Sequence, residues 1–113
     1  MDEGKVIAGG EAIVVLIAVA SRGEAEKIAR RLVEDRLAAC VNLVPQVRSF
    51  FTWEGKLSQE DEVLLVVKSR RARFRELADT VKALHSYSVP EIIAMPILEG
   101  AADYLRWITD ATT

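Results

Sequence analysis

The sequence predicts an α+β fold, in which one antiparallel sheet carries helices on one face. Three observations predict it. A run rich in valine and isoleucine lies near the N-terminus, the hydrophobic period then alternates between helix-like and strand-like, and the elements follow the order β-α-β-β-α-β with one more helix at the end. The 113 residues are the length of a single domain.

Composition narrows the class of protein. Half of the residues are hydrophobic and 28% are charged, which is typical of a globular protein with one core. The net charge of −2 gives no reason to expect nucleic acid or an anionic membrane as a partner. Cys40 is the single cysteine, so no disulfide can form within one chain, and a reducing compartment is expected.

The first strand is predicted at residues 12–20, which read AIVVLIAVA. This run ends in a small-x-small pattern that resembles a signal-peptidase site, but the residues before it are more acidic than basic, the wrong charge for a signal peptide. It is also too short to cross a bilayer as a helix. We therefore expect a cytoplasmic protein with a flexible tail at residues 1–10 and one domain at residues 11–113.

A helix is expected next. Ser21 and Glu24 have the spacing of a capping box, and the apolar residues that follow recur at helical spacing until about Arg36. Residues 39–53 then alternate with a period of two, which predicts a long strand. Pro45 interrupts it and indicates a bulge or a solvent-facing stretch. One face is predicted to carry Val41, Leu43, Val47, Phe51 and Trp53.

Glu54-Gly55 predicts the turn of a hairpin, whose second strand covers residues 60–69. Ser69 is expected to cap a second helix, which ends before Pro90 because a residue preceding proline avoids the helical region. A short strand follows at residues 92–97, and Gly100 is expected to open the last helix.

Two split βαβ units in this order give the ferredoxin-like arrangement, with both helices on one face of the sheet. The strand at residues 39–53 would lie at a sheet edge, and it carries three aromatic residues, Phe50, Phe51 and Trp53. A long aromatic edge invites another chain, so these residues are predicted to form a subunit interface. The alternative is that the hairpin folds back over its own sheet.

Four segments, which span nearly the whole chain from Val14 onward, resemble signatures of the CutA divalent-ion tolerance family: LAACVNLVP, SFFTWEGKL, HSYSVPEIIAMPI and EGAADYLRWI, which begin at residues 37, 49, 85 and 99. Ser86 differs from the proline that is usual there in the family. The resemblance implies a ferredoxin-like protomer, a homotrimer that pairs its sheets edge to edge, and tolerance of copper and other divalent ions. It also implies a likeness to the PII signalling proteins, trimers with ligand clefts between subunits.

Candidate metal ligands are Cys40, His85 and Glu91, a set that suits copper or zinc. The first helix ends near Cys40 and the second near His85, and the two helices run in opposite directions. These side chains therefore lie at opposite ends of one sheet, and a metal shared by them would lie between subunits. The alternative roles are structural: a small buried hydrophobe for Cys40, a helix cap for His85 and a surface charge for Glu91.

A second candidate site is an inter-subunit cleft. Trp53, Lys68, His85, Tyr87 and Glu91 resemble the positions that line the family's clefts, and as a set they suit a small anionic or metal-chelated ligand. They could instead form interface contacts only.

The basic cluster at residues 70–75 contains four arginines. Anion or nucleic-acid binding would use them, but pairing with the acidic residues of the hairpin, Glu54, Glu60, Asp61 and Glu62, is the more ordinary explanation.

Catalysis has little support, because the single histidine has no nucleophile elbow near it and no glycine loop for phosphate is present. We expect a protein that is not an enzyme. The first hypothesis is a trimeric protein of divalent-metal response. The second is a PII-like module that binds a small molecule, with metal incidental, and the third is a trimeric scaffold without a ligand.

Overall fold

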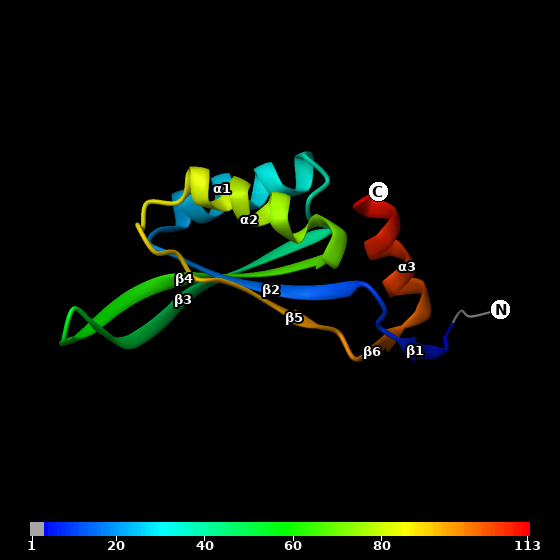
Figure 1. Cartoon of the computed structure of the whole chain (residues 1–113), viewed down its shortest axis with the longest axis horizontal. Coiled ribbons are helices and arrows are strands. Elements are labelled where there is room, and N and C mark those ends of the chain that lie inside the picture. The colour runs from blue at the N-terminus through cyan, green and yellow to red at the C-terminus, as the bar shows by residue number, and fades with distance from the viewer. Residues whose placement is uncertain (1–3) are drawn as a thin grey trace.

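The computed structural model describes residues 4–113 and contains the predicted antiparallel sheet (Figure 1). Its four strands lie in the order β3-β4-β2-β5, so the long strand β3 is an edge, as predicted. Their bounds are Ala12–Val19 for β2, Cys40–Trp53 for β3, Lys56–Arg70 for β4 and Ile92–Pro96 for β5.

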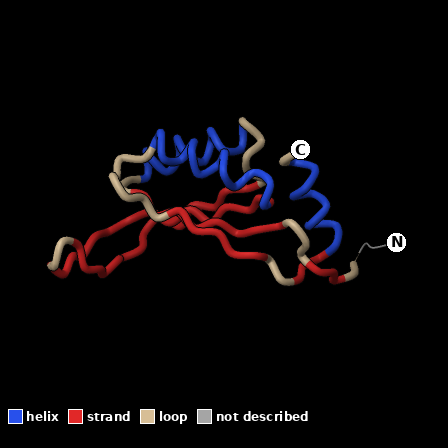
Figure 2. The backbone as a smooth tube through the Cα atoms, in the orientation of Figure 1, coloured by secondary structure: helices blue, strands red, loops and turns tan. Residues whose placement is uncertain are grey.

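Two helices, α1 (Arg22–Glu34) and α2 (Phe74–Leu84), cover one face of this sheet (Figure 2). Alternate residues of β2 and β4 meet the apolar stripes of the helices because the side chains of a strand point to opposite faces in turn. The Oγ of Ser21 accepts a hydrogen bond from Glu24 N–H at 3.2 Å, which confirms the predicted helix start. The fully buried core includes Val15, Ile17, Ile28, Leu32, Leu65, Val67, Leu77 and Val81.

Ser69 does not cap the second helix, contrary to the sequence-based expectation. Strand β4 continues through Arg70, and a single 3-10 turn, η1 (Arg71–Arg73), precedes α2. The alternation of β4 points the side chain of Ser69 into the core, where it is fully buried. There its hydroxyl donates a hydrogen bond of 2.6 Å to the carbonyl of Leu37.

The predicted tail at residues 1–10 is partly a strand. Residues 1–3 lie outside the described part, but β1 (Val6–Ala8) pairs antiparallel with β6 (Glu99–Ala101). The pairing of β6 also moves the start of the last helix, α3 (Ala102–Ala111), beyond the expected Gly100. Glycine at position 9 lets the backbone pass close to that of Ile97, because a Cβ at this position would lie 1.7 Å from the Ile97 carbonyl oxygen.

Arginines bind the C-terminal end of α3, which lies at the end of the sheet farthest from the hairpin turn (Figure 1). Arg70 donates to the Thr112 carbonyl at 2.8 Å and Arg73 donates to the same oxygen at 2.8 Å. Arg36 donates to the Asp110 carbonyl at 2.8 Å. Helix C-termini leave carbonyls without partners and carry partial negative charge. The expected pairing of Arg70 and Arg73 with hairpin acids was therefore wrong.

At a bulge in strand β3, the side chains that pointed to one face of the sheet begin to point to the other. Val44 pairs with Leu64 but Val47 pairs with Glu62, so β3 has one residue more than β4 between these pairs. An extra residue reverses the orientation of every side chain beyond it. Val41 and Leu43 pack against the helix-covered core, whereas Phe51 and Trp53 lie on the opposite side of the strand. The prediction that all of them share one face was wrong beyond Pro45.

The pairing of β4 with β2 ends at Val63, so the residues of β4 that precede Val63 in the chain pair only with β3. Residues 47–62 thus form a two-stranded projection, here called the hairpin extension, which points away from the helices and does not fold back over the sheet (Figure 1). Glu54 and Gly55 both have positive φ, 51° and 79°, which confirms the predicted turn. No helix within residues 4–113 is long and apolar enough to cross a membrane.

Candidate functional site

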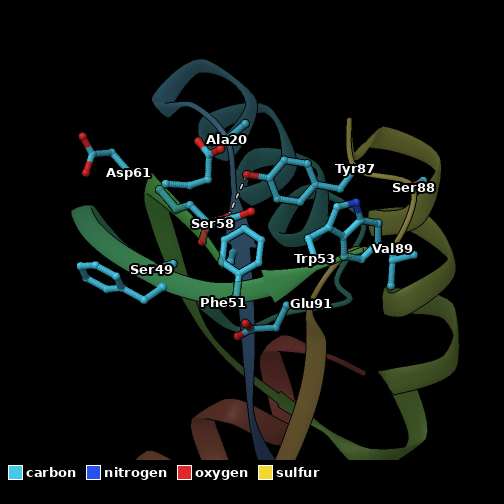
Figure 3. Close-up of a pocket in the computed structure, with 14 residues that line it drawn as sticks. Ala20, Ser49, Phe51, Trp53, Ser58, Asp61, Tyr87, Ser88, Val89 and Glu91 are labelled. Atoms are coloured by element: carbon cyan, nitrogen blue, oxygen red, sulfur yellow. Dashed lines mark hydrogen bonds between the residues drawn. The ribbon is translucent and has the colours of Figure 1, made fainter. Parts of the chain in front are cut away.

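A pocket of about 820 Å³ lies between the hairpin extension and the loop at residues 85–91 (Figure 3). The strands place its side chains by their alternation, so residues two apart on β3 and on β4 face it together. The loop closes the opposite side. The lining residues include Ala18, Ala20, Ser49, Phe50, Phe51, Trp53, Ser58, Glu60, Asp61, Glu62, Tyr87, Ser88, Val89 and Glu91.

Aromatic rings form much of the wall. Phe51, Trp53 and Tyr87 gather around one space in Figure 3, with Glu91 on its lower side. Trp53 is 47% exposed, so its ring is presented to a ligand or a partner rather than packed in the core. An apolar wall with a few polar groups is the usual composition of a ligand pocket.

The charge of the pocket is negative. Four lining residues are acidic, namely Glu60, Asp61, Glu62 and Glu91, and none of the described lining residues is lysine, arginine or histidine. Asp61 is paired with Arg48 at 3.1 Å and lies apart from the aromatic rings in Figure 3. In the part of the chain that the structure describes, no ion pair balances the other three carboxylates.

Tyr87 and Glu62 connect the two sides of the pocket. The Tyr87 hydroxyl donates a hydrogen bond of 2.8 Å to Glu62 Oε2, and Glu62 is only 8% exposed. Burial raises the pKa of Tyr87 far above its ordinary value of 10.0, and so do the hydrogen bond to Glu62 and the negative charges of Glu62, Glu60 and Glu24. The phenol is therefore a stable donor at neutral pH.

His85 does not line the pocket, but its side chain holds the loop at residues 85–91 against strand β2. Its side chain is fully buried, and its ring lies 4.8 Å from that of Tyr87. Nδ1 accepts a hydrogen bond of 3.0 Å from Tyr87 N–H, so Nε2 carries the proton and donates it to the Ala18 carbonyl at 2.7 Å. The Glu24 carboxylate lies 3.5 Å from Nδ1 and accepts from Ser86 N–H at 3.3 Å. Both ring nitrogens are thus used within the protomer.

Cys40 lies at the other end of the sheet. It pairs with Lys68 in the β3-β4 ladder, and Lys68 in turn pairs with Val14 of β2. Val14 and Ala18 are four residues apart, which is about 13 Å of strand between the row of Cys40 and the position of His85. The Cys40 thiol and the Lys68 ammonium both contact the side-chain oxygen of Asn42.

The structure brings together Trp53, Tyr87 and Glu91 of the predicted site residues and leaves Cys40, Lys68 and His85 elsewhere. Lys68 and His85 do not line the pocket of one protomer, so its described lining residues carry no positive charge. The predicted inter-subunit cleft for an anionic or metal-chelated ligand stays a prediction. Within residues 4–113, no group of three or more histidine, cysteine or acidic side chains is arranged to hold a metal ion.

Sequence reasoning missed Glu60 and Glu62 as pocket residues. Their spacing of two residues on a predicted strand was the available signal, because it places both carboxylates on one face.

Comparison with known proteins gives a consistent result. The family model described as "CutA1 divalent ion tolerance protein" matches residues 13–111. A divalent-cation tolerance protein CutA of Thermus thermophilus is 50% identical over 99 residues, which is 88% of this chain and 96% of that protein. A chloroplastic CutA of Arabidopsis thaliana is 43% identical over 88% of this chain, but the match spans only 55% of that longer protein.

Solved structures agree with these relatives. The Thermus thermophilus structure superposes with a TM-score of 0.89 at 49% identity, covering 90% of this chain and 99% of that one. A structure from Archaeoglobus fulgidus, described as a periplasmic divalent cation tolerance protein, gives 0.88 at 44% identity over 90% and 99% of the two chains.

Proposed function

The chain belongs to the CutA1 divalent ion tolerance family, and from this premise we propose that it is a cytoplasmic homotrimer of divalent-cation tolerance. It acts by binding rather than by catalysis, and it holds a metal ion such as copper, or a small ligand, between subunits. The observation that carries the proposal is the hairpin extension, which projects from the sheet and presents exposed aromatic side chains around a pocket.

The hairpin extension supports assembly on physical grounds. An isolated two-stranded ribbon is only marginally stable in water. Phe50 is 60% exposed and Leu57 is 76% exposed, so the ribbon also presents apolar surface. The sheet face opposite the helices adds exposed Ile93 and Met95. Partner chains that pair with the edge strand and cover this face would stabilise the ribbon and bury its apolar surface. That the assembly contains three chains is taken from the family resemblance.

The separation of Cys40 and His85 within one chain limits where a metal ion bound by both could lie. A site that used both would need residues from two chains, since they lie in different rows of one sheet. Glu91 is exposed beside the pocket and is free to turn toward a neighbour. Binding of copper by Cys40, His85 and Glu91 therefore depends on assembly, and His85 would have to give up one of its present hydrogen bonds.

Light scattering with size exclusion tests the assembly. The expected mass is three times the 12.5 kDa of one chain. Trp53→Ala should lower the mass or make it depend on concentration, and the matched control Trp107→Ala should not, because Trp107 lies on α3, away from the hairpin extension. A monomer at micromolar concentration would refute the trimer.

Calorimetric titration with Cu(I), Cu(II) and Zn(II) tests the metal. We expect binding by the assembled protein and weaker binding in Cys40→Ala and Glu91→Gln. Because His85 is structural, His85→Ala is interpreted only if its circular dichroism matches the parent. Unchanged affinity in all three variants would exclude these ligands.

A second candidate function is a PII-like module for a small molecule. The observation that favours it is the pocket itself, which is large enough for such a ligand and lacks a preformed metal cluster among the described residues. Silent metal titrations together with saturable binding of a small molecule would favour this candidate over the first.

A further inference from the structure

The buried apolar side chains form two separate clusters. The larger cluster lies between the four-stranded sheet and the helices α1 and α2. The smaller one joins α3 to one end of the sheet, and within residues 4–113 it includes no residue of α1 or α2. Its buried members are Ala12, Ala39, Leu105 and Ile108. Only two of these are larger than alanine, so α3 is held by a small apolar cluster of its own.

Strands β1 and β6 belong with α3 rather than with the main sheet. They form a two-stranded sheet of their own beside the start of α3 (Figure 1). The N–H of Ala102, the first residue of α3, donates to the Lys5 carbonyl at 2.9 Å. The backbone of Gly100 in β6 lies against Leu105, because a Cβ there would come within 3.2 Å of the Leu105 Cδ2. A two-stranded ribbon is only marginally stable by itself, so β1, β6 and α3 depend on one another.

Three arginines fasten the other end of α3 to the main body. Arg70 donates to the Thr112 hydroxyl at 2.9 Å and to its carbonyl at 2.8 Å, and Arg73 donates to the same carbonyl at 2.8 Å. With the two bonds from Arg36, five hydrogen bonds end within residues 110–113. Local opening is typical of elements with few buried apolar contacts that are held by such partly exposed bonds.

We propose that β1, β6 and α3 form one strap, which closes over the end of the sheet and opens as a unit while the four-stranded sheet, α1 and α2 stay folded. Arg36, Arg70 and Arg73 are the lock of this strap. Its opening uncovers Ala12 and Ala39 at the end of the sheet and releases the three guanidiniums from their carbonyls. The inference does not rest on the proposed function, because every contact behind it lies within one chain.

Hydrogen exchange of the whole protein, in urea below its unfolding transition, tests the strap. The hydrogen-bonded amides of β1, β6 and α3 should exchange through one common opening with one dependence on urea. Their exchange should be at least about tenfold faster than that of the buried residues of β2 and β4. Equal exchange of the strap and of β2 and β4 would overturn the inference. Fast exchange confined to the last turn of α3 would also overturn it, since that is the fraying of a helix end.

Two substitutions at opposite ends of the strap test whether it opens as a unit. Arg73→Gln removes a lock donor and should accelerate exchange severalfold in β1, which Arg73 does not contact, as well as at residues 109–113. Gly9→Ala acts beside β1 and should accelerate exchange at residues 109–113 in turn. Arg75→Gln, an exposed change on α2, is the matched control and should leave both regions unchanged. Acceleration confined to the neighbourhood of each substitution would overturn the inference.

Protein concentration separates the strap from the proposed trimer. Opening within one chain should give the same exchange in the strap at every protein concentration, with the mass followed by light scattering. If exchange in the strap rises on dilution together with a fall in mass, opening follows the dissociation of subunits, and the inference is overturned while the assembly stands. Concentration-independent opening of the strap in a protein that proves monomeric supports the inference and refutes the trimer.

Discussion

Tyr87 and Glu62 form a hydrogen bond of 2.8 Å that fastens the loop after α2 to strand β4. Glu62 is the residue of the hairpin extension next to Val63, where the pairing of β4 with β2 ends, so the bond holds the base of the extension. On the other side of the loop, His85 accepts from Tyr87 N–H and contacts the end of β2. One tyrosine thus joins three segments that line or support the pocket.

The ionisation of Tyr87 should be displaced far into alkali. In Tyr104→Phe, Tyr87 is the only tyrosine, and its tyrosinate absorbance should remain absent where an ordinary phenol, with a pKa of 10.0, is half ionised. The cause is burial, followed by the bond to Glu62 and the nearby carboxylates. Because the folded pKa lies above the unfolded one, the associated stability is full below pH 10.0 and is lost above it.

A Glu62→Gln variant is the control for that titration. It removes the negative charge but keeps an acceptor, so the Tyr87 pKa should fall toward its ordinary value while remaining raised by burial. Ionisation of Tyr87 at its ordinary pKa in the parent protein would show that the hydroxyl is not buried against the carboxylate in solution.

Tyr87→Phe should loosen the loop without unfolding the sheet. The substitution leaves Glu62, a buried carboxylate, without its donor, at a cost of about 1–3 kcal/mol. Urea unfolding at one fixed protein concentration measures the cost, since assembly couples to stability. Hydrogen exchange should accelerate at residues 85–91 and 58–62.

Tyr104→Phe is the matched control for Tyr87→Phe, because it removes a half-exposed phenol on α3, far along the chain from the loop and from Glu62. Equal effects of the two substitutions on stability and on exchange in the loop would contradict the role assigned to the Tyr87–Glu62 bond.

Gly9→Ala should be among the most damaging single-methyl changes. A Cβ would lie 1.7 Å from the Ile97 carbonyl oxygen, so the β1-β6 pair must separate from the end of β5. The expected loss is about 2–4 kcal/mol, seen in urea unfolding and in faster exchange at β1 and β6. Gly23→Ala meets open space inside α1 and should stabilise by about 0.5–1 kcal/mol. Similar stabilities of the two variants would contradict this packing.

Local signals explain which parts of the fold the sequence predicted. The capping box at Ser21 and the turn at Glu54-Gly55 depend on neighbours within a few residues, and both were confirmed. The strand order followed from topology, which also separated Cys40 from His85. By contrast, the tail at residues 1–10 contains a strand whose partner lies more than ninety residues away, so no local pattern marks it.

The candidate site was only partly predictable for a similar reason. Pro45 indicated a bulge, but the consequence for Phe51 and Trp53 depended on how many residues β3 gains against β4. Arg70 and Arg73 bind the Thr112 carbonyl at the C-terminal end of α3, far along the chain. The prediction that they pair with the acidic residues of the nearby hairpin was therefore wrong. Charge pattern alone cannot rank acceptors that belong to distant elements.

Arg36 combines a strained backbone with a useful side chain, and two substitutions separate these. It follows α1 with φ of 58°, and Leu37 N–H donates to the Leu32 carbonyl at 2.9 Å, as in a helix end that usually has glycine. Its guanidinium donates to the carbonyls of Asp110 and Thr113 at the end of α3. Arg36→Ala loses the donors and keeps the strain, whereas Arg36→Gly loses the donors and relieves it.

Arg36→Gly should therefore be more stable than Arg36→Ala by about 1 kcal/mol in urea unfolding at matched protein concentration. Both variants should show faster hydrogen exchange at residues 109–113, because the loss of the guanidinium leaves carbonyls of that turn without a donor. Equal stabilities would mean that the positive φ is not retained in solution. Unchanged exchange would mean that Arg70 and Arg73 alone hold the end of α3.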